Sequence, residues 1–403
     1  MPRFRPKDEQ ELARLISWAA GDGEALEVVA AGTKRGLGRP VEAPHVLDVT
    51  AFTGIEAYEP EELVLTAKPG TPLVEIESTL QRADQMLAFE PGDWGPIFGG
   101  EAGRQTLGGM LACNLAGPRR IKQGAARDHL LGFRAVSGRG EAFKAGGRVV
   151  KNVTGYDLSK LMAGSYGTLA VLTEVTVKVL PRPEATATLV LPGLDDARAV
   201  AAMTHALNSP HEVSGAAHIP AAVAADVMSG TSRSATLIRV EGPGPSVEAR
   251  AVALRQELGD FGTVELLREG AATAPWRALA DIRPFAAERD RTIWRVSVAP
   301  QSGPAVAAAI TSALDARITF DWGGGLLWCA VVGDAADGGA EIVRTAAKTA
   351  GGHATLVRAT VELRSHIAVF EPQPAPLAAL SRRIKESFDP KRILNPGRMY
   401  RDV

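Results

Sequence analysis

A glycine-rich, basic loop at residues 32–38 contains the first groups of the chain that could bind a ligand. The loop reads Gly-Thr-Lys-Arg-Gly-Leu-Gly, so it offers bare backbone, one hydroxyl group and two positive charges. Backbone N–H groups exposed in such a loop can surround an anion, and a pyrophosphate is the anion that suits it best. The loop matches neither a Walker A sequence nor a Gly-x-Gly-x-x-Gly run that opens a helix, which disfavours a Rossmann fold. The alternative interpretation is a basic surface turn.

A second glycine-rich run, residues 106–120, has small residues at seven places between positions 106 and 117. Gly108 and Gly109 would each weaken a helix by about 1 kcal/mol relative to alanine, so the run indicates a need for small size more than for helicity. One side of this segment could therefore lie flat against a ligand. Cys113 is expected to be a small buried residue and not a thiolate, because no histidine neighbours it.

The stretch from Arg148 to Pro181 combines a short helix, a glycine turn and a long strand. Residues 168–180 alternate between two faces and stop at Pro181, which predicts a strand. Residues 156–162 predict about two helical turns, and residues 164–167 predict a turn. This order places bare backbone beside a cavity, which suits a large planar cofactor. The alternative is an ordinary glycine turn in a sheet.

The other elements of the N-terminal half must position these three stretches. We expect a helix over residues 8–20 that stops at Gly21, and a second helix that begins with Thr71 as its N-cap and Pro72 at its first position. The order of elements is typical of an α+β fold and not of a regular βαβ wind. The expected strands are residues 26–31, 46–49, 55–58 and 63–67, followed by a hairpin of residues 130–137 and 141–144.

The C-terminal half predicts a cap domain with an antiparallel sheet and helices on one face of it. The expected strands are residues 187–191, 235–240, 292–298, 326–332 and 354–358, and the expected helices are residues 195–207, 246–258, 304–314 and 341–350. We therefore expect a cofactor-binding domain at residues 1–182, the cap at residues 183–372, and a C-terminal helix and tail at residues 373–403 that return to the cofactor.

Composition narrows the classes of function. The chain has 403 residues, 45% hydrophobic and 23% charged, and a formal net charge of -1, so charge gives no reason to expect nucleic acid or an anionic membrane as a partner. The N-terminus lacks the apolar core of a secretory signal, and no window predicts a spanning helix. Cys113 and Cys329 form no Cys-x-x-Cys pair, which argues against zinc, iron–sulfur and disulfide frameworks. The expected compartment is the cytoplasm.

Four ordered segments resemble the FAD-binding family typified by vanillyl-alcohol oxidase and p-cresol methylhydroxylase. Residues 106–114 (TLGGMLACN) resemble its T-x-G-G-x-x-x-x-N segment, and residues 151–158 (KNVTGYDL) resemble the K-N-x-x-G-Y-D-L run of its glycolate- and D-lactate-oxidising branch. Residues 164–174 (GSYGTLAVLTE) resemble that branch's G-S-E-G-T-L-G-I-I-T-E. Residues 388–398 (FDPKRILNPGR) resemble the family's closing D-P-x-x-x-L-N-P-G.

The resemblance implies a p-cresol-methylhydroxylase-type domain of two α+β subdomains with FAD between them. It places the pyrophosphate on the loop that begins at Gly32, the adenine side near residues 167–172, and the isoalloxazine near Asn395. The residues that it assigns to FAD are Gly32, Thr33, Lys34, Arg35, Gly36, Leu37, Pro91, Thr106, Leu107, Gly108, Gly109, Ala112, Asn114, Gly117, Asn152, Gly155, Tyr156, Asp157, Gly167, Thr168, Leu172 and Asn395.

The sequence departs from the family pattern at two places, where Tyr166 and Ala170 replace the usual glutamate and glycine. Contacts at these places are therefore expected to differ. Relatives with covalently attached flavin often carry a histidine near the pyrophosphate loop. Here the loop has Lys34 and Arg35, which implies that FAD is held noncovalently.

The cap lacks the H-x-x-x-D-G-N-like segment that catalytic 2-hydroxy-acid dehydrogenases of this branch usually carry, with histidines that bind a metal. No histidine of the cap lies in a comparable setting, so we expect no metal site and name no catalytic residue; the histidines in question are His205, His211, His218, His353 and His366. Residues 320–328 (FDWGGGLLW) instead resemble a segment in FAD-binding subunits of multi-subunit bacterial glycolate oxidases. The alternative is a hairpin turn with two packed tryptophans.

These resemblances favour an FAD-binding subunit of a glycolate-oxidising complex that relays or accepts electrons. A partner flavoprotein would oxidise glycolate to glyoxylate, an iron–sulfur subunit would carry the electrons onward, and any membrane association would come through these partners. Two alternatives stay open. One is a self-sufficient FAD-dependent 2-hydroxy-acid dehydrogenase, and the other is a non-catalytic scaffold that retains the fold.

Overall fold

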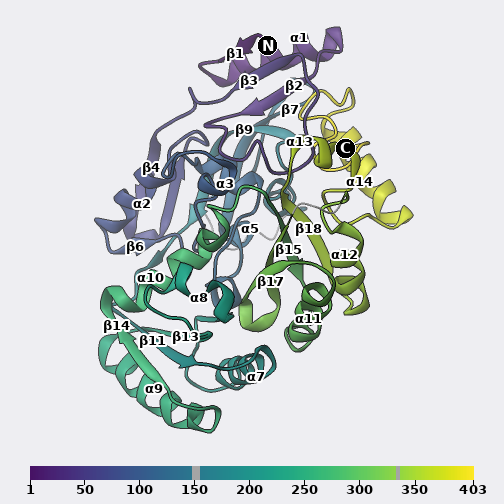
Figure 1. Cartoon of the computed structure of the whole chain (residues 1–403). Helices are drawn as coiled ribbons and strands as arrows, with labels where there is room; N and C mark the ends of the chain where they lie inside the picture. Colours follow the sequence, from purple (N-terminus) through teal and green to yellow (C-terminus); the bar gives the residue numbers. More distant parts are fainter. Residues whose placement is uncertain (148–154, 333–335) are drawn as a thin grey trace. The chain divides into compact units, whose positions relative to one another are not determined.

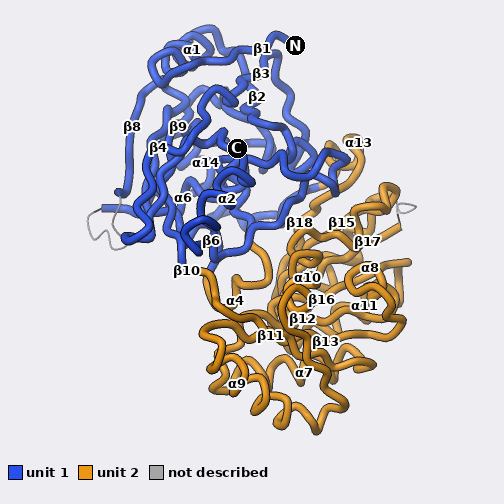
Figure 2. Tube along the Cα trace, turned by 90° about the vertical axis from the view of Figure 1, so that its left-hand side faces the viewer, with its two compact units in different colours: residues 1–115, 124–181, 368–403 blue, residues 116–123, 182–367 orange. Residues whose placement is uncertain are grey.

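The computed structural model describes residues 1–147, 155–332 and 336–403, which form two compact units (Figure 2). Unit 1 contains residues 1–115, 124–181 and 368–403, and unit 2 contains residues 116–123 and 182–367. The chain therefore leaves unit 1 after Leu115 and returns to it at Gly124. It leaves unit 1 again after Pro181 and returns at Ala368. We describe each unit by itself.

Unit 1 begins with a three-stranded parallel sheet in the order β1-β3-β2, made of Arg3–Phe4, His45–Asp48 and Leu26–Val29. Helix α1 (Glu9–Asp22) buries its apolar stripe against this sheet, with Ile16 in one cluster with Leu26 and Leu47. The helix ends at Gly23, whose φ of +74° closes the last turn in the left-handed conformation. The predicted stop at Gly21 is therefore wrong, because Gly21 stays within the helix.

The second sheet of unit 1 has five antiparallel strands in the order β4-β5-β9-β7-β8. The long predicted strand is confirmed as β9 (Ala170–Lys178), the central strand, and its Val171, Val175 and Val177 are buried. The predicted hairpin is also confirmed, since β7 and β8 pair across residues 138–140. The other strands are β4 (Ile55–Glu59), β5 (Val64–Ala67), β7 (Leu130–Ser137) and β8 (Ala142–Gly146), and β6 (Gln85–Met86) pairs separately with β10 (Leu180–Pro181).

Short helices complete unit 1. Helix α2 (Leu73–Gln81) has Pro72 as its N-cap, so the predicted cap at Thr71 is wrong. The Thr71 hydroxyl instead donates to the carbonyl oxygen of Lys68 at 2.7 Å and accepts from the N–H of Gly54. This hydroxyl therefore fixes the preceding loop. The remaining helices are α3 (Leu107–Ala112), α5 (Ala126–His129), α6 (Leu158–Met162) and α14 (Ala375–Phe388).

Unit 2 is built on an eight-stranded antiparallel sheet in the order β14-β11-β13-β12-β16-β17-β15-β18 (Figure 1). Five of these strands were predicted, and β12, β14 and β16 were not. The strands are β11 (Ala185–Pro192), β12 (Gly215–Ile219), β13 (Ala235–Gly242), β14 (Glu265–Arg268), β15 (Arg291–Ser297), β16 (Ala316–Asp321), β17 (Leu326–Val332) and β18 (His353–Arg358). The helices are α4 (Arg120–Gln123), α7 (Asp196–Leu207), α8 (Ala221–Val227), α9 (Gly244–Glu257), α10 (Glu269–Ala280), α11 (Gly303–Ala313), α12 (Ala340–Thr349) and α13 (Val361–His366).

Helices cover both faces of this sheet, so the expectation of helices on one face is wrong. Leu189 of β11 packs in one cluster with Met203 of α7 and Val247 of α9. Its neighbour Thr188 points to the opposite face, because successive strand residues alternate. There the Thr188 hydroxyl donates to a carbonyl of α10 at 2.7 Å and accepts from Trp276 of the same helix at 2.9 Å.

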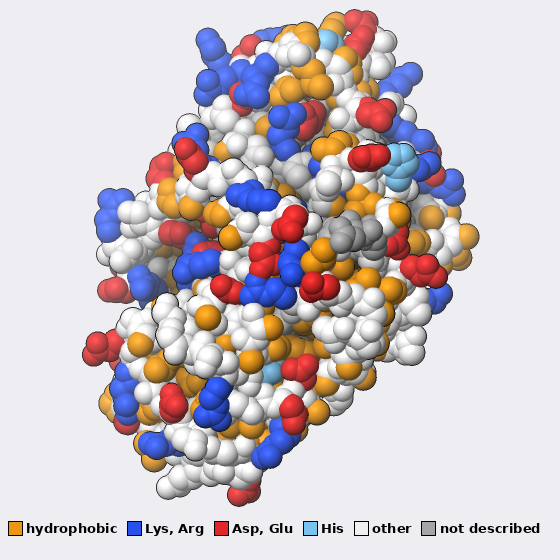
Figure 3. Space-filling view, in the orientation of Figure 1, with side chains coloured by type: hydrophobic (Ala, Val, Ile, Leu, Met, Phe, Trp, Pro, Cys, Tyr) orange, Lys and Arg blue, Asp and Glu red, His pale blue; other side chains and the backbone are white. Residues whose placement is uncertain are grey.

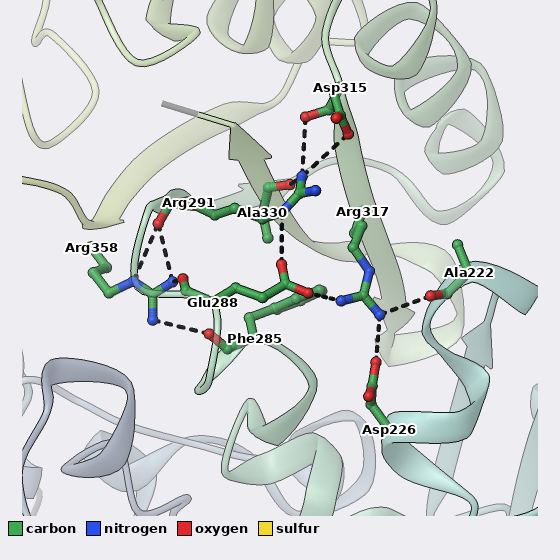
Figure 4. Close-up of polar contacts among 9 residues, drawn as sticks. All are labelled: Ala222, Asp226, Phe285, Glu288, Arg291, Asp315, Arg317, Ala330 and Arg358. Atoms are coloured by element: carbon green, nitrogen blue, oxygen red, sulfur yellow. Dashed lines mark hydrogen bonds and ion pairs between the residues drawn. The ribbon is translucent and has the colours of Figure 1, made fainter. Parts of the chain in front are cut away.

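A cluster of charged residues lies at the β15–β18 side of unit 2 and is drawn in Figure 4. Glu288 pairs with Arg291 at 2.7 Å and with Arg317, and Arg317 also pairs with Asp226. Arg358 of β18 donates to the carbonyl oxygens of Phe285, Glu288 and Arg291, which fixes the loop before β15. Burial lowers the pKa of Arg358 to about 10.

The surface carries both signs of charge. In Figure 3, acidic and basic side chains are interspersed across the face in view, in keeping with the formal net charge of -1. Among the described residues, no helix has both the length and the apolar character of a membrane span.

Candidate functional site

A cavity of about 120 Å³ that opens to solvent lies within unit 1. Most of its lining comes from four chain segments: the end of β2 with the loop after it, helix α3, the start of β9 with the turn before it, and the C-terminal tail. The lining includes Val28, Thr33, Pro69, Gly109, Cys113, Leu172 and Arg398. Much of it is backbone and small side chains.

The loop after β2 is folded by its own backbone hydrogen bonds. The N–H of Arg35 donates to the carbonyl oxygen of Gly32 at 3.2 Å, and the N–H of Leu37 donates to that of Lys34 at 3.0 Å. Gly32 needs its φ of +74° for the first of these turns. The Arg35 guanidinium is paired with Glu27, with 2.8 Å between Nε and Oε1, so a carboxylate of the chain already neutralises its charge.

Helix α3 begins where Thr106 caps its N-terminus, accepting from the N–H of Gly109. The two adjacent positions of this helix are glycine for different structural reasons. A Cβ at Gly108 would lie 2.4 Å from Cβ of Pro69, so this glycine allows the helix to pack against that residue. A Cβ at Gly109 would contact only the Thr106 hydroxyl, at 3.2 Å. Gly109 therefore leaves room on the side of the cavity.

The C-terminal tail closes another side of the cavity through Asn395. Its side-chain oxygen accepts from the N–H of Val28 at 2.8 Å, and its side-chain nitrogen donates to the carbonyl oxygen of Tyr166 at 2.8 Å. Gly167 lies against it, since a Cβ there would come within 2.8 Å of the Asn395 amide nitrogen. Asn395 therefore ties β2, the turn before β9 and the tail together, and both ends of its amide are used in doing so.

Two buried cations face this cavity without a matching carboxylate. Lys34 and Arg398 are each 6% exposed, and no carboxylate of the described residues forms an ion pair with either. Among the residues that the structure describes, Lys34 donates only to Thr33 and Gln105, at 3.2 and 3.3 Å, and Arg398 donates to the carbonyl oxygen of Lys34 at 2.7 Å. Burial lowers the pKa of both groups. Because a buried charge needs a partner, these residues fit a ligand that carries negative charge, such as a dinucleotide.

The chain matches two known families and many individual proteins. The family described as "FAD binding domain" matches residues 3–146, and the one described as "FAD linked oxidases, C-terminal domain" matches residues 371–399. The chain is 37% identical to glycolate oxidase subunit GlcE of Escherichia coli (strain K12) over 394 residues, which cover 98% of each chain. The chain belongs to the FAD-linked oxidase family. As a member, it is a flavoprotein oxidoreductase with FAD as its cofactor.

Two further comparisons support the family and the fold. This FAD-linked oxidase is 25% identical to glycolate oxidase subunit GlcD of Bacillus subtilis (strain 168), over 98% of this chain and 88% of the relative. The solved structure of 4-ethylphenol oxidase from Gulosibacter chungangensis superimposes with a TM-score of 0.74 at 14% identity, covering 98% and 88% of the two chains. The predicted α+β fold of the p-cresol-methylhydroxylase type is therefore confirmed.

The structure brings half of the predicted FAD-binding residues to the cavity of this FAD-linked oxidase. The residues that line it are Gly32, Thr33, Lys34, Arg35, Thr106, Gly108, Gly109, Ala112, Gly167, Leu172 and Asn395. The sequence analysis did not select Arg398 or Cys113 for the site. Arg398 is the last residue of the closing motif, so its charge and position were the signals that could have revealed it.

The other predicted residues that the structure describes do not line the cavity. Gly36 packs against the Phe98 ring, Asn114 accepts from the N–H of Arg127, and Tyr156 is 94% exposed. Asn152 lies outside the described residues, and Gly117 belongs to unit 2. The remaining residues that do not line the cavity are Leu37, Pro91, Leu107, Gly155, Asp157 and Thr168.

The Asp-Trp-Gly-Gly-Gly segment forms the turn between β16 and β17 in unit 2. Trp322 and Gly323 have φ values of +54° and +69° there. The indole N–H of Trp322 donates to the carbonyl oxygen of Gly117 at 3.2 Å, and the guanidinium groups of Arg120 and Arg295 lie 4.3 and 5.1 Å from its ring centroid. This turn therefore anchors residues 116–123 to unit 2. Within the described ranges, no group of three or more His, Cys, Asp or Glu could hold a metal ion.

Proposed function

We propose that this chain is the FAD-binding subunit of a glycolate-oxidising complex, in which it relays or accepts electrons. The observation that carries the proposal is the likeness to glycolate oxidase subunit GlcE, which extends over 98% of both chains and not only over the FAD-binding domain. Conversion of glycolate to glyoxylate releases two electrons and two protons per molecule. FAD supplies the redox chemistry when it is bound, and the protein supplies its position and electrostatic surroundings.

The cavity of unit 1 is the proposed site of the nucleotide part of FAD. The loop of residues 32–35 would hold the negative charge of the pyrophosphate, with Lys34 as its cation. Helix α3 would pass beside the ligand at Gly109, where nothing larger than hydrogen occupies that side of the cavity. Asn395 would act by holding the walls together, because its amide is occupied by Val28 and Tyr166.

We infer that FAD is held noncovalently. Covalent attachment to a protein needs a nucleophilic side chain at the flavin, usually in its deprotonated form. Cys113 lines the cavity, but burial raises the pKa of its thiol, which keeps it protonated at neutral pH. Precipitation of the protein with acid, which should release all yellow colour to the supernatant, measures this directly.

The proposed partners are a second flavoprotein subunit of the GlcD type, which would oxidise glycolate, and an iron–sulfur subunit. Cluster binding requires several cysteine thiolates, and this sequence has two cysteines far apart, with Cys329 buried in β17. A cluster would therefore be held by another chain. We place the complex in the cytoplasm, at the membrane only through these partners.

Visible absorption spectroscopy under anaerobic conditions tests the proposal. The chain purified alone should show an oxidised flavin spectrum that glycolate leaves unchanged. Addition of a catalytic amount of the partner flavoprotein should then bleach the absorbance near the flavin maximum. Bleaching by glycolate without the partner would overturn the relay function and would show that the chain is a dehydrogenase by itself.

A further inference from the structure

The C-terminal segment 385–398 is fastened to unit 1 by a fully buried ion pair. Lys385 and Asp389 are both 0% exposed, with 2.8 Å between the ammonium nitrogen and the carboxylate oxygen. The same ammonium group donates to the carbonyl oxygens of Thr168 and Leu394, at 2.6 and 2.9 Å. Thr168 follows Gly167, and Leu394 precedes Asn395, and both of these neighbours line the cavity. Lys385 thus holds two walls of the cavity together.

The segment then runs along β2 and the glycine-rich loop. The N–H of Leu26 donates to the carbonyl oxygen of Ile393 at 2.7 Å, and the N–H of Asn395 donates to that of Leu26 at 3.0 Å. Further on, the N–H of Arg39 donates to the carbonyl oxygen of Arg398 at 2.8 Å. A Cβ at Gly38 would lie 3.0 Å from that carbonyl oxygen, so the loop and the tail are packed closely. These contacts place the Arg398 side chain beside the glycine-rich loop of residues 32–38.

Arg398 and Lys34 are two buried cations that line the same cavity. The Arg398 guanidinium bonds to the carbonyl oxygen of Lys34, so one cation is held by the backbone of the other. Each is 6% exposed, neither forms an ion pair with a carboxylate of the described residues, and both line the cavity. A buried positive charge is unfavourable unless an anionic group and hydrogen bonds compensate it, so an anionic ligand in the cavity would stabilise both cations.

We propose that Arg398 binds the diphosphate of FAD together with Lys34, and that the Lys385–Asp389 pair is the positioning device that brings Arg398 there. The inference rests on the proposed FAD cavity, but it does not depend on glycolate or on any partner. A guanidinium group suits a diphosphate because its N–H groups match two oxygens at once. The chain thus supplies one cation from each end of its sequence to the same part of the cofactor.

Binding of two flavins to the full-length apoprotein tests the role of Arg398, with flavin fluorescence as the readout. FAD contains the diphosphate and riboflavin does not. Arg398→Met should weaken FAD binding by about tenfold to a hundredfold, the usual effect of removing a charge-assisted hydrogen bond. Riboflavin binding should change by less than about twofold, and Arg398→Lys should restore part of the FAD affinity. The matched control is Arg383→Met, an exposed position on α14.

The outcomes separate this inference from the proposed cavity. Unchanged FAD affinity in Arg398→Met, or an equal loss for FAD and riboflavin, would overturn the diphosphate contact while leaving the cavity as the flavin site. Failure of the wild-type chain to bind FAD would overturn both. Stronger protection of the wild type than of Arg398→Met by ADP in thermal unfolding, with adenosine protecting both equally, would support the contact independently.

A double-mutant cycle tests the positioning role of the buried pair. Lys385→Met combined with Asp389→Asn removes the clamp without leaving one charge unpaired, and circular dichroism checks that the variant folds. The loss of FAD affinity from this change should be several-fold smaller in the R398M background than in the wild type, because the clamp acts through Arg398. Equal losses in the two backgrounds would show a general structural role and overturn the positioning claim. Lys385→Gln combined with Asp389→Asn, which keeps polar groups at both positions, serves as the milder variant if the first double change prevents folding.

Discussion

Two regions of this protein bury positive charge, and they do so in opposite ways. In unit 2, Arg291 and Arg317 share the carboxylate of Glu288, and Glu241 lies between Arg119 and Arg239. In the cavity of unit 1, Lys34 and Arg398 have only neutral oxygens of the chain as hydrogen-bond partners. In unit 2, the cations therefore stabilise the fold, because carboxylates of the chain supply their counter-charge. Lys34 and Arg398 also line a cavity, unlike Arg358 of unit 2, whose guanidinium is held by three carbonyl oxygens, so the counter-charge of Lys34 and Arg398 is expected on a ligand.

The largest expected effect comes from filling the cavity itself. Gly109→Trp would place an indole on the open side of α3, so we predict complete loss of bound FAD from a folded chain. The ratio of flavin to protein absorbance in the purified protein measures it. Gly21→Trp is the matched control, since Gly21 also lies in a helix but has nothing within 4 Å of its Cβ position. Normal flavin content in Gly109→Trp would mean that the cavity is not the FAD site and that Lys34 and Arg398 bind a different anion.

Removal of a counter-charge in unit 2 should have the next largest effect. Burial tends to raise the pKa of Glu241, but Arg239 and Arg119 outweigh it and lower the pKa from 4.5 to about 2. That shift corresponds to roughly 3 kcal/mol, so Glu241→Gln should lower the free energy of unfolding at pH 7 by about that amount. Urea unfolding followed by tryptophan fluorescence measures the loss.

The pH dependence of the same variant gives a second check. A carboxylate with a lowered pKa stabilises the fold above its unfolded value of 4.5, and this contribution is lost as pH falls from 4.5 towards 2. The difference between the wild type and Glu241→Gln should therefore shrink over that range. Glu248→Gln, which breaks the exposed pair with Arg268, is the control and should have no measurable effect. A constant difference down to pH 2 would contradict the ion-pair explanation.

A smaller loss is expected in the cluster of Figure 4. Glu288→Gln leaves Arg291 and Arg317 with weaker partners, but the carboxylate is 22% exposed, so solvent screens part of the effect. We predict a decrease of about 1–2 kcal/mol in the free energy of unfolding. Asp315→Asn is the matched control, because that carboxylate also pairs with Arg291 but is 72% exposed. An equal effect of the two variants would mean that burial does not set the strength of these pairs.

The sequence predicted the parts of the fold whose causes are local. The alternation of residues 168–180 specified β9, and the structure places residues 32–35 of the predicted glycine-rich loop, Lys34 among them, at the cavity. The short strands β12, β14 and β16 were missed, since four to six residues give too little period-two signal. Helices on both faces of the unit 2 sheet were also missed, because Thr188 looks like an ordinary strand residue until its bond to α10 is seen.

The parts of the site that depend on distant contacts could not be read from the sequence. Asn395 was expected at the isoalloxazine, which stays a prediction; that its amide also joins Val28 to Tyr166, across more than 200 residues in each case, has no local signal. Gly108 was assigned to the ligand and lines the cavity, but the sequence could not show that Pro69 also requires its small size. Arg398 becomes a candidate only when the tail is seen beside the loop of residues 32–38.

The smallest effect has the opposite sign and tests the comparison most directly. Burial lowers the pKa of Lys34 below 10.5, so its charge costs free energy of folding at neutral pH, and that cost is relieved as pH rises towards 10.5. Lys34→Met should therefore stabilise the FAD-free chain at pH 7 by about 1 kcal/mol while it weakens FAD binding. Thermal unfolding of the apoprotein measures the first effect, and Lys122→Met, at an exposed ion pair, is the control. If Lys34→Met destabilised the apoprotein as Glu241→Gln destabilises unit 2, the cation of the cavity would be structural, and the distinction between the two regions would fail.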